Sequence, residues 1–202
     1  MNKYLIEFIG TFFLVLTLAL TANPIAVGAV LAAMVYMGGY ISGGHYNPAV
    51  TLAVLIRGKI KMQEAVNYFI VQVLGAFVAS FSYFLITSKI FIPKPNPSFS
   101  LLATGLVEFL FTFLLAFVVL HVATSEKNKG NQYFGLAIGL ALLVGGFAGG
   151  KISGAVYNPA IAAGSMLFDF ANLAIYLPTL VLYLGMQLLG GLLAGLVYKA
   201  TS

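Results

Sequence analysis

Residues 41–49 read ISGGHYNPA, and residues 152–160 repeat them as ISGAVYNPA, with only the two central residues changed. Each copy ends in an Asn-Pro-Ala triplet, Asn47-Pro48-Ala49 in the first and Asn158-Pro159-Ala160 in the second. Asn is favoured at the N-cap of a helix, where its side chain accepts from the first free backbone amides. Pro is favoured at the first helical position, where its missing amide costs nothing. Each triplet therefore predicts the start of a helix.

The apolar runs that follow the two triplets are short, and they cover residues 49–56 and 160–168. About ten residues of helix reach only half-way across a bilayer. Backbone that is not helical at this depth is tolerated where it is buried in protein or lines a wet cavity. The two further Asn-Pro pairs, Asn23-Pro24 and Asn96-Pro97, precede no half-length apolar run and are interpreted as ordinary turns.

The composition of the remaining chain indicates a membrane protein. The 202 residues are 61% hydrophobic and 7% charged, whereas soluble domains carry about 25% charged residues. A spanning helix needs about 20 mostly apolar residues. Six runs approach this length, at residues 4–22, 25–41, 65–86, 101–123, 134–148 and 173–198. The sequence predicts an all-α membrane protein with six transmembrane helices and two half-helices, and no separate soluble domain.

The second half of the chain repeats the first. Glu-Phe-x-x-Thr-Phe occurs at residues 7–12 and at residues 108–113, and Gln72 to Gly75 is matched by Gln187 to Gly190. The matches keep the same order, which predicts repeats at residues 1–98 and 99–202 within one transmembrane domain. Each repeat holds three spans, so the two must insert with opposite orientation. Inverted repeats place a site at the midplane between the halves.

The charges give the orientation. The net charge is +5, and the cations lie in short connectors rather than on a surface for nucleic acid, which we do not expect as a partner. With both termini cytoplasmic, the inner side carries more cations than the outer side, as the positive-inside rule requires. The inner set is Lys3, Arg57, Lys59, Lys61, Lys127, Lys129 and Lys199, and the outer set is Lys89, Lys94 and Lys151.

Two half-helices that enter from opposite faces would meet N-terminus to N-terminus at the midplane. Each end carries about +0.5 charge. At about 4 Å and an effective dielectric of about 20, the pair would repel a monovalent cation by about 4 kcal/mol. A neutral molecule would not feel this barrier, and the Asn amides would remain as donors to its oxygen. The arrangement predicts a passive pore for neutral hydrogen-bonding solutes that rejects cations.

The chain resembles the aquaporin and glycerol-facilitator, or major intrinsic protein, family. The resemblance rests on residues 42–51, on the second Asn-Pro-Ala triplet, on Glu7 with Gly10-Thr11, and on Glu108. It covers essentially the whole chain. It implies six tilted helices, two half-helices and one pore per subunit. It also implies water and small neutral solutes as partners, a homotetramer, and a multi-pass location in the plasma membrane.

The sequence departs from the family at the outer constriction, the selectivity filter. Counted from the two asparagines, the four matching positions are Val27, Gly146, Ala155 and Ile161. Most members carry Arg at the last position, and water-selective members add an aromatic residue and a His. The small apolar set predicts a wider opening that passes solutes such as glycerol, urea or ammonia besides water. The competing interpretation is that bulky neighbours such as Phe147 or Phe168 refill the opening.

Other polar residues within the spans are expected to be structural. An intramembrane carboxylate costs about 3 kcal/mol and is a functional candidate by default. The resemblance implies instead that Glu7 and Glu108 bond backbone amides of the loops beside the half-helices. Gln72 and Gln187 are expected to brace in the same way, and His45 to brace the inner mouth. Two groups near span ends, His121 and Asp169, are expected to be solvated.

Three alternatives compete with the channel. An ion-coupled secondary transporter would need an intramembrane relay, which only Glu7 and Glu108 could supply. A structural or adhesion protein with a closed pore would show no solute flux. An enzyme is the least favoured, because no serine has a base and an orienting acid beside it. We expect no metal and no cofactor, since no His, Asp and Glu set has ligand spacing and cysteine is absent.

Overall fold

Helices dominate the computed structural model, which describes residues 2–202 and places no strand among them. Six helical segments are long and apolar enough to cross a membrane. They are α1 (Lys3–Thr21), α2 (Pro24–Ser42), α4 (Met62–Thr87), α5 (Leu101–Val119) with a π-helical extension (Leu120–Thr124), α6 (Phe134–Ser153), and α8 (Leu173–Thr201) after a 3-10 turn (Phe170–Asn172). Two helices of ten residues, α3 (Pro48–Arg57) and α7 (Pro159–Phe168), complete the fold, with a second 3-10 turn at Glu126–Asn128. The predicted fold class is confirmed.

The short helices begin as the sequence predicts. Asn47 caps α3 by accepting at Oδ1 from the Ala49 amide at 2.8 Å, and Asn158 caps α7 by accepting from the Ala160 amide at 2.9 Å. Pro stands at the first helical position of both. Each segment before a cap turns sharply after a glycine with positive φ, Gly43 after α2 and Gly154 after α6, a conformation that costs glycine little.

Most boundaries lie within three residues of the prediction, and the end of α6 differs by five. The apolar run was expected to end at residue 148, but α6 continues to Ser153. Glycines and a lysine lower the hydropathy of this last turn. Gly149 is nevertheless required there, because a side chain at this position would collide with the hydroxyl of Tyr157. The helix ends where Gly154 adopts positive φ, a stop that hydropathy does not register.

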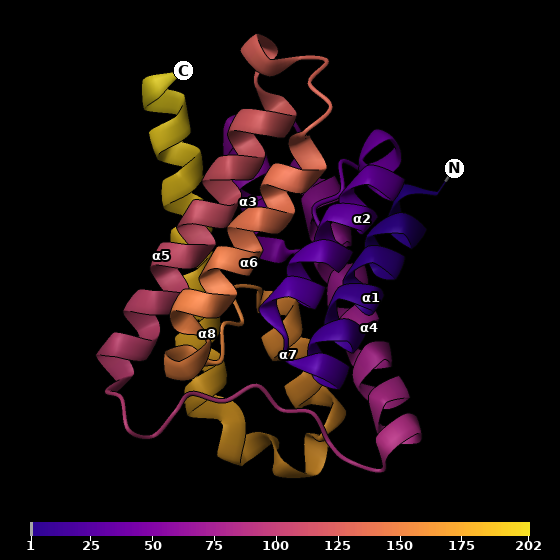
Figure 1. Ribbon diagram of the computed structural model, residues 1–202, viewed down its shortest axis with the longest axis vertical. Helices are drawn as coiled ribbons and strands as arrows, with labels where there is room; N and C mark the ends of the chain where they lie inside the picture. Colours follow the sequence, from indigo (N-terminus) through magenta and orange to yellow (C-terminus); the bar gives the residue numbers. More distant parts are fainter. Residues whose placement is uncertain (1) are drawn as a thin grey trace.

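The helices pack in two matching groups that exchange their short helices. In the first half α1 packs against α2 and α4, and in the second half α5 packs against α6 and α8. The short helix α3 packs against α8 of the other half, and α7 packs against α4. Figure 1 shows α3 and α7 in opposite halves of the molecule, and it shows both chain termini at the same end. The segment 88–100 crosses the opposite end (Figure 1).

Candidate functional site

The two triplet asparagines meet across the two halves. The Nδ2 of Asn47 donates to the carbonyl of Tyr157 at 2.8 Å, and the Nδ2 of Asn158 donates to the carbonyl of Tyr46 at 2.9 Å. Both asparagines are buried, with 3% and 2% of their surface exposed. Each side-chain amide carries two N–H donors and uses one in this exchange. The second N–H of each asparagine is therefore left for a molecule beside it.

The tyrosine before each asparagine shapes the loop, a role that the sequence reasoning missed. Tyr46 and Tyr157 have φ of +49° and +46°, a conformation that is strained for a bulky side chain. Their hydroxyls donate to Met34 O at 2.8 Å and to Gly145 O at 2.9 Å, which anchors both rings on the preceding long helix. The one sequence signal for this role is that Tyr occurs at the same place in both copies of the repeated stretch.

Glu7 and Glu108 hold the two loops in the same way, and both carboxylates are fully buried. Each carboxylate accepts four hydrogen bonds from neutral donors, so no cation is needed to satisfy its oxygens. The donors to Glu7 are Ser42 Oγ, the amides of His45 and Tyr46, and Gln72 Nε2, at 2.6–2.9 Å. The donors to Glu108 are Ser153 Oγ, the amides of Val156 and Tyr157, and Gln187 Nε2, at 2.6–3.0 Å.

His45 adds a bond that the second half lacks. Its Nδ1 lies 3.1 Å from Thr51 Oγ1, and Thr51 Oγ1 also donates to Asn47 O at 3.0 Å. Because that hydroxyl has only one hydrogen, it accepts from His45, which places the imidazole proton on Nδ1. Gln72 Nε2 donates to the same hydroxyl at 3.1 Å. His45 therefore ties the loop to the first turn of α3.

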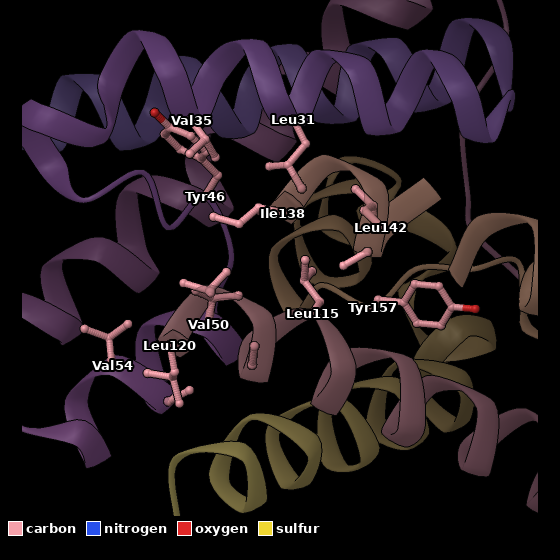
Figure 2. Packing of buried hydrophobic residues seen from close by; sticks show 14 of the residues in the cluster. Leu31, Val35, Tyr46, Val50, Val54, Leu115, Leu120, Ile138, Leu142 and Tyr157 are labelled. Carbon is pink, nitrogen blue, oxygen red and sulfur yellow. The ribbon is translucent and has the colours of Figure 1, made fainter. Parts of the chain in front are cut away.

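A narrow cavity runs past the asparagines. Its volume is about 20 Å³, and a single water molecule needs about 10–15 Å³. The wall contains His45, Asn47 and Asn158, and its other side chains are aliphatic: Leu14, Leu31, Val50, Leu115, Val119, Ile138, Leu142, Val156 and Ile161. Figure 2 shows Leu31, Val50, Leu115 and Ile138 converging from four different helices. Polar contact is thus confined to a few donors within an apolar tube.

Both asparagines line the narrow cavity, but only one of the four positions assigned to the outer filter does. Ile161 lines the narrow cavity, whereas Val27, Gly146 and Ala155 lie outside its wall. Val27 is buried against the aliphatic core, and Ala155 is half-buried beside it. A side chain at Gly146 would be directed at Pro24, the first residue of α2. The structure therefore joins only Ile161 directly to the asparagines.

The bulky residues considered as substitutes for the filter lie elsewhere. Phe147 is 61% exposed on α6. Phe168 packs at the end of α7 against three rings of α4, those of Phe77, Phe81 and Phe84, with centroids 5.7–6.1 Å apart. Neither ring lines the narrow cavity.

A vestibule of about 520 Å³ adjoins the narrow cavity. His45 and Val119 line both spaces. The rim of the vestibule carries Lys59 and Glu126, whose charged groups pair at 3.3 Å. His45 therefore stands where the two spaces adjoin.

Two residues expected to be solvated are more covered than the sequence predicts. Asp169 is only 8% exposed, because the 3-10 turn that follows α7 folds back and brings Asn172 and Tyr176 onto its carboxylate. His121 is half-buried in the π-helical turn, where its ring lies between those of Phe117 and Tyr198 at 4.3 and 4.8 Å. Proximity to a span end did not imply full exposure in either case.

Comparisons with known proteins agree with this architecture. Residues 1–198 match the family model described as "Major intrinsic protein". The chain is 36% identical to glycerol uptake facilitator protein-like 6 of Lactiplantibacillus plantarum, over 83% of this chain and 84% of that protein. It is 32% identical to aquaporin Z of Rhodopseudomonas palustris, over 100% and 93% of the two chains. The solved aquaglyceroporin of Plasmodium falciparum superposes with a TM-score of 0.80 at 24% identity, over 98% of this chain and 95% of that one.

Proposed function

The chain belongs to the major intrinsic protein family, and on that premise we propose that the facing asparagines form the midplane of a passive channel for water and small neutral solutes. The observation that carries the proposal is the exchange of hydrogen bonds between Asn47 and Tyr157 and between Asn158 and Tyr46. It brings the N-terminal ends of α3 and α7 to one cavity. Each asparagine there keeps a spare donor for a passing oxygen.

Cation exclusion follows from the same arrangement. Both helix N-termini carry partial positive charge, and the wall between them offers no carboxylate among its residues. A cation that entered would lose its hydration shell, because the wall is mostly aliphatic. It would also face the electropositive N-terminal ends of α3 and α7. Water and neutral solutes lose much less, because their oxygens can accept from the asparagines.

We further propose that the channel admits solutes larger than water. The positions assigned to the outer filter, Val27, Gly146, Ala155 and Ile161, supply no fixed cation and no side-chain donor. One relative is named glycerol uptake facilitator protein-like 6. Glycerol and urea are therefore the first candidates, with ammonia as a neutral gas.

The burial of the two intramembrane acids argues against an ion-coupled transporter. All four oxygens of Glu7 and Glu108 accept hydrogen bonds that hold the loops in place. Protonation of either acid in a transport cycle would break bonds on which the asparagines depend. Their positions favour a structural role.

The proposal also covers the location, topology and oligomeric state of the protein. We place the protein in the plasma membrane as a multi-pass chain with both termini cytoplasmic, built from inverted repeats 1–98 and 99–202. We propose a homotetramer with one pore per subunit, a typical assembly of this family. We assign the chain no enzymatic activity and no cofactor.

Solute flux into vesicles tests the function. The purified chain is reconstituted into liposomes, and swelling or shrinkage is followed by light scattering on steps of sucrose, glycerol and urea. We expect faster water, glycerol and urea flux than in empty liposomes, with no increase in sodium or proton leak. Water flux without glycerol or urea flux would refute the wide filter, and flux driven by a proton gradient would favour the transporter.

A further inference from the structure

A second pocket lies away from the channel, between the ends of α4, α7 and α8 and the segment 90–94. Its volume is about 610 Å³, against about 20 Å³ for the narrow cavity. The two share no lining residue. Ligand pockets for small molecules are about 300–1,000 Å³. The pocket therefore has room for a molecule that need not pass through the channel.

Asp169 gives this pocket a buried negative charge. Its Oδ2 accepts from the Tyr176 hydroxyl at 2.5 Å, and Asn172 Nδ2 lies 3.1 Å from both carboxylate oxygens. These donors are neutral, and the two ion pairs found among residues 2–202, Lys3–Glu64 and Lys59–Glu126, leave Asp169 out. Buried charges are normally paired. The carboxylate is hydrogen-bonded, but its charge is not balanced by a cation.

The walls around the carboxylate suit an organic cation. Tyr83, Phe91 and Tyr176 line the pocket, and the first two rings pack edge to face with centroids 6.1 Å apart. Ile92, Met166 and Ile175 add apolar surface. An ammonium group is attracted both to a carboxylate and to the faces of aromatic rings, and most strongly where water is partly excluded. A neutral or anionic ligand would leave the charge of Asp169 unmatched.

We propose that this pocket binds a primary ammonium group carried on a short apolar stem, with Asp169 as the counter-charge and Tyr83 and Tyr176 as its aromatic walls. The proposal does not depend on the channel conducting. The group can come from a free amine or from the ethanolamine head of a phospholipid, because both present the same charge to the carboxylate.

Lys94 is the competing cation, since it also lines the pocket. It is exposed and makes no ion pair with Asp169 within 4 Å. The Lys94 carbonyl packs beside Gly154, on the side of the segment that faces α6. The ammonium of Lys94 is therefore treated as a rival occupant that the experiment must exclude.

The test compares two ligands of the same shape on the full chain in a non-ionic maltoside detergent. Propylammonium and 1-propanol differ mainly in charge, and saturation-transfer NMR reports the binding of each against empty micelles. We expect propylammonium to bind at least tenfold more tightly than 1-propanol. Asp169→Asn should weaken the binding of propylammonium at least tenfold and leave the binding of 1-propanol unchanged. Glu126→Gln removes an exposed carboxylate at the vestibule and should change the binding of neither ligand.

Further variants keep the result interpretable. Tyr83→Leu removes a ring that makes no hydrogen bond to Asp169, and it should weaken propylammonium several-fold even if Asp169→Asn fails to fold. Lys94→Gln should leave propylammonium binding equal or tighter. Equal binding of the two ligands to the natural protein would overturn the proposal. So would propylammonium binding that appears only in Lys94→Gln, because Lys94 would then occupy the site.

Added lipid distinguishes the two sources of the ammonium group. If the occupant is a lipid head, phosphatidylethanolamine should weaken propylammonium binding several-fold, and phosphatidylglycerol should not. If the occupant is a free amine, neither lipid should compete. Water flux of Asp169→Asn in liposomes should equal that of the natural protein, and failure of the channel assay would leave the binding result unaffected.

Discussion

At the scale of single residues, the two buried glutamates explain why a strained loop persists inside the molecule. Tyr46 and Tyr157 adopt positive φ, which is costly for a large side chain. Each strained tyrosine amide donates to a glutamate oxygen, at 2.6 Å in the first half and 2.7 Å in the second. The strain at each tyrosine is thus offset by a charged acceptor placed one helix away.

Removal of one charge should therefore loosen a whole loop. Glu108→Gln replaces one accepting oxygen by a donor, which leaves a buried backbone N–H facing another N–H. An unsatisfied buried group costs roughly 1–3 kcal/mol. We expect a clear fall in the unfolding temperature in detergent and a loss of water flux. Glu126→Gln, at an exposed carboxylate, should show neither change, and a Glu108→Gln protein as stable as the natural one would contradict the bracing role.

Ile161 is the filter position that lies on the narrow cavity itself. Ile161→Arg would place a long cationic side chain beside the asparagines. We expect glycerol and urea flux to fall at least tenfold while part of the water flux remains, because water needs the smallest opening. Ile161→Leu keeps the volume and should leave all three fluxes near their natural values. An equal loss of water and glycerol flux in Ile161→Arg would mean simple blockage.

At the scale of helices, contact between short and long helices depends on glycine. A side chain at Gly191 of α8 would press on the backbone carbonyl of Ala49 in the first turn of α3. In the second contact, between α7 and α4, the glycine lies on the short helix. A side chain at Gly164 of α7 would lie 2.5 Å from Ala76 of α4. Close approach of backbones is what small residues permit at membrane helix contacts.

Gly191→Ala should therefore act on the channel from outside its wall. The added methyl group displaces Ala49 and, with it, the cap at Asn47. We expect several-fold lower water flux and a lower unfolding temperature. Gly185→Ala is the matched control on the same helix, because nothing lies within 4 Å of that position. Unchanged flux in Gly191→Ala would show that α3 tolerates the shift.

The helices and their short partners could be predicted from sequence because they rest on local signals. Asn-Pro caps, glycine stops and apolar length are properties of neighbouring residues. The left-handed tyrosines could not be predicted in this way, because a carboxylate about 40–50 residues away stabilises them. The burial of Asp169 also escaped, since it depends on a 3-10 turn that folds Tyr176 back over it.

In the candidate site too, local features could be predicted from sequence and contacts between distant residues could not. The asparagines were identified from their repeated context, whereas the partners of their amides, the carbonyls of Tyr46 and Tyr157, belong to the opposite half of the chain. The assignment of Val27, Gly146 and Ala155 rests on counting from the asparagines and stays a prediction. Side-chain volume around an opening depends on how α2 and α6 pack, which spacing along the chain does not specify.

At the scale of the whole molecule, the absence of cysteine allows the proposed topology to be tested cleanly. Lys129→Cys and Ser98→Cys place single thiols at exposed positions. The first lies in the loop between α5 and α6 and the second in the segment 88–100, and Figure 1 shows these two segments at opposite ends of the fold. A membrane-impermeant maleimide applied to intact cells should label Ser98→Cys only. Lys129→Cys should react after the cells are permeabilised. The reverse pattern would invert the orientation and contradict the cytoplasmic location of both termini.

The exchange of the short helices has a consequence for the origin of the chain. Since α3 packs on α8 and α7 on α4, neither half encloses an asparagine by itself. An ancestor with a single repeat could have closed the same tube only as an antiparallel pair of identical chains. In a single fused chain the two copies can differ, as they do at the equivalent positions His45 and Val156.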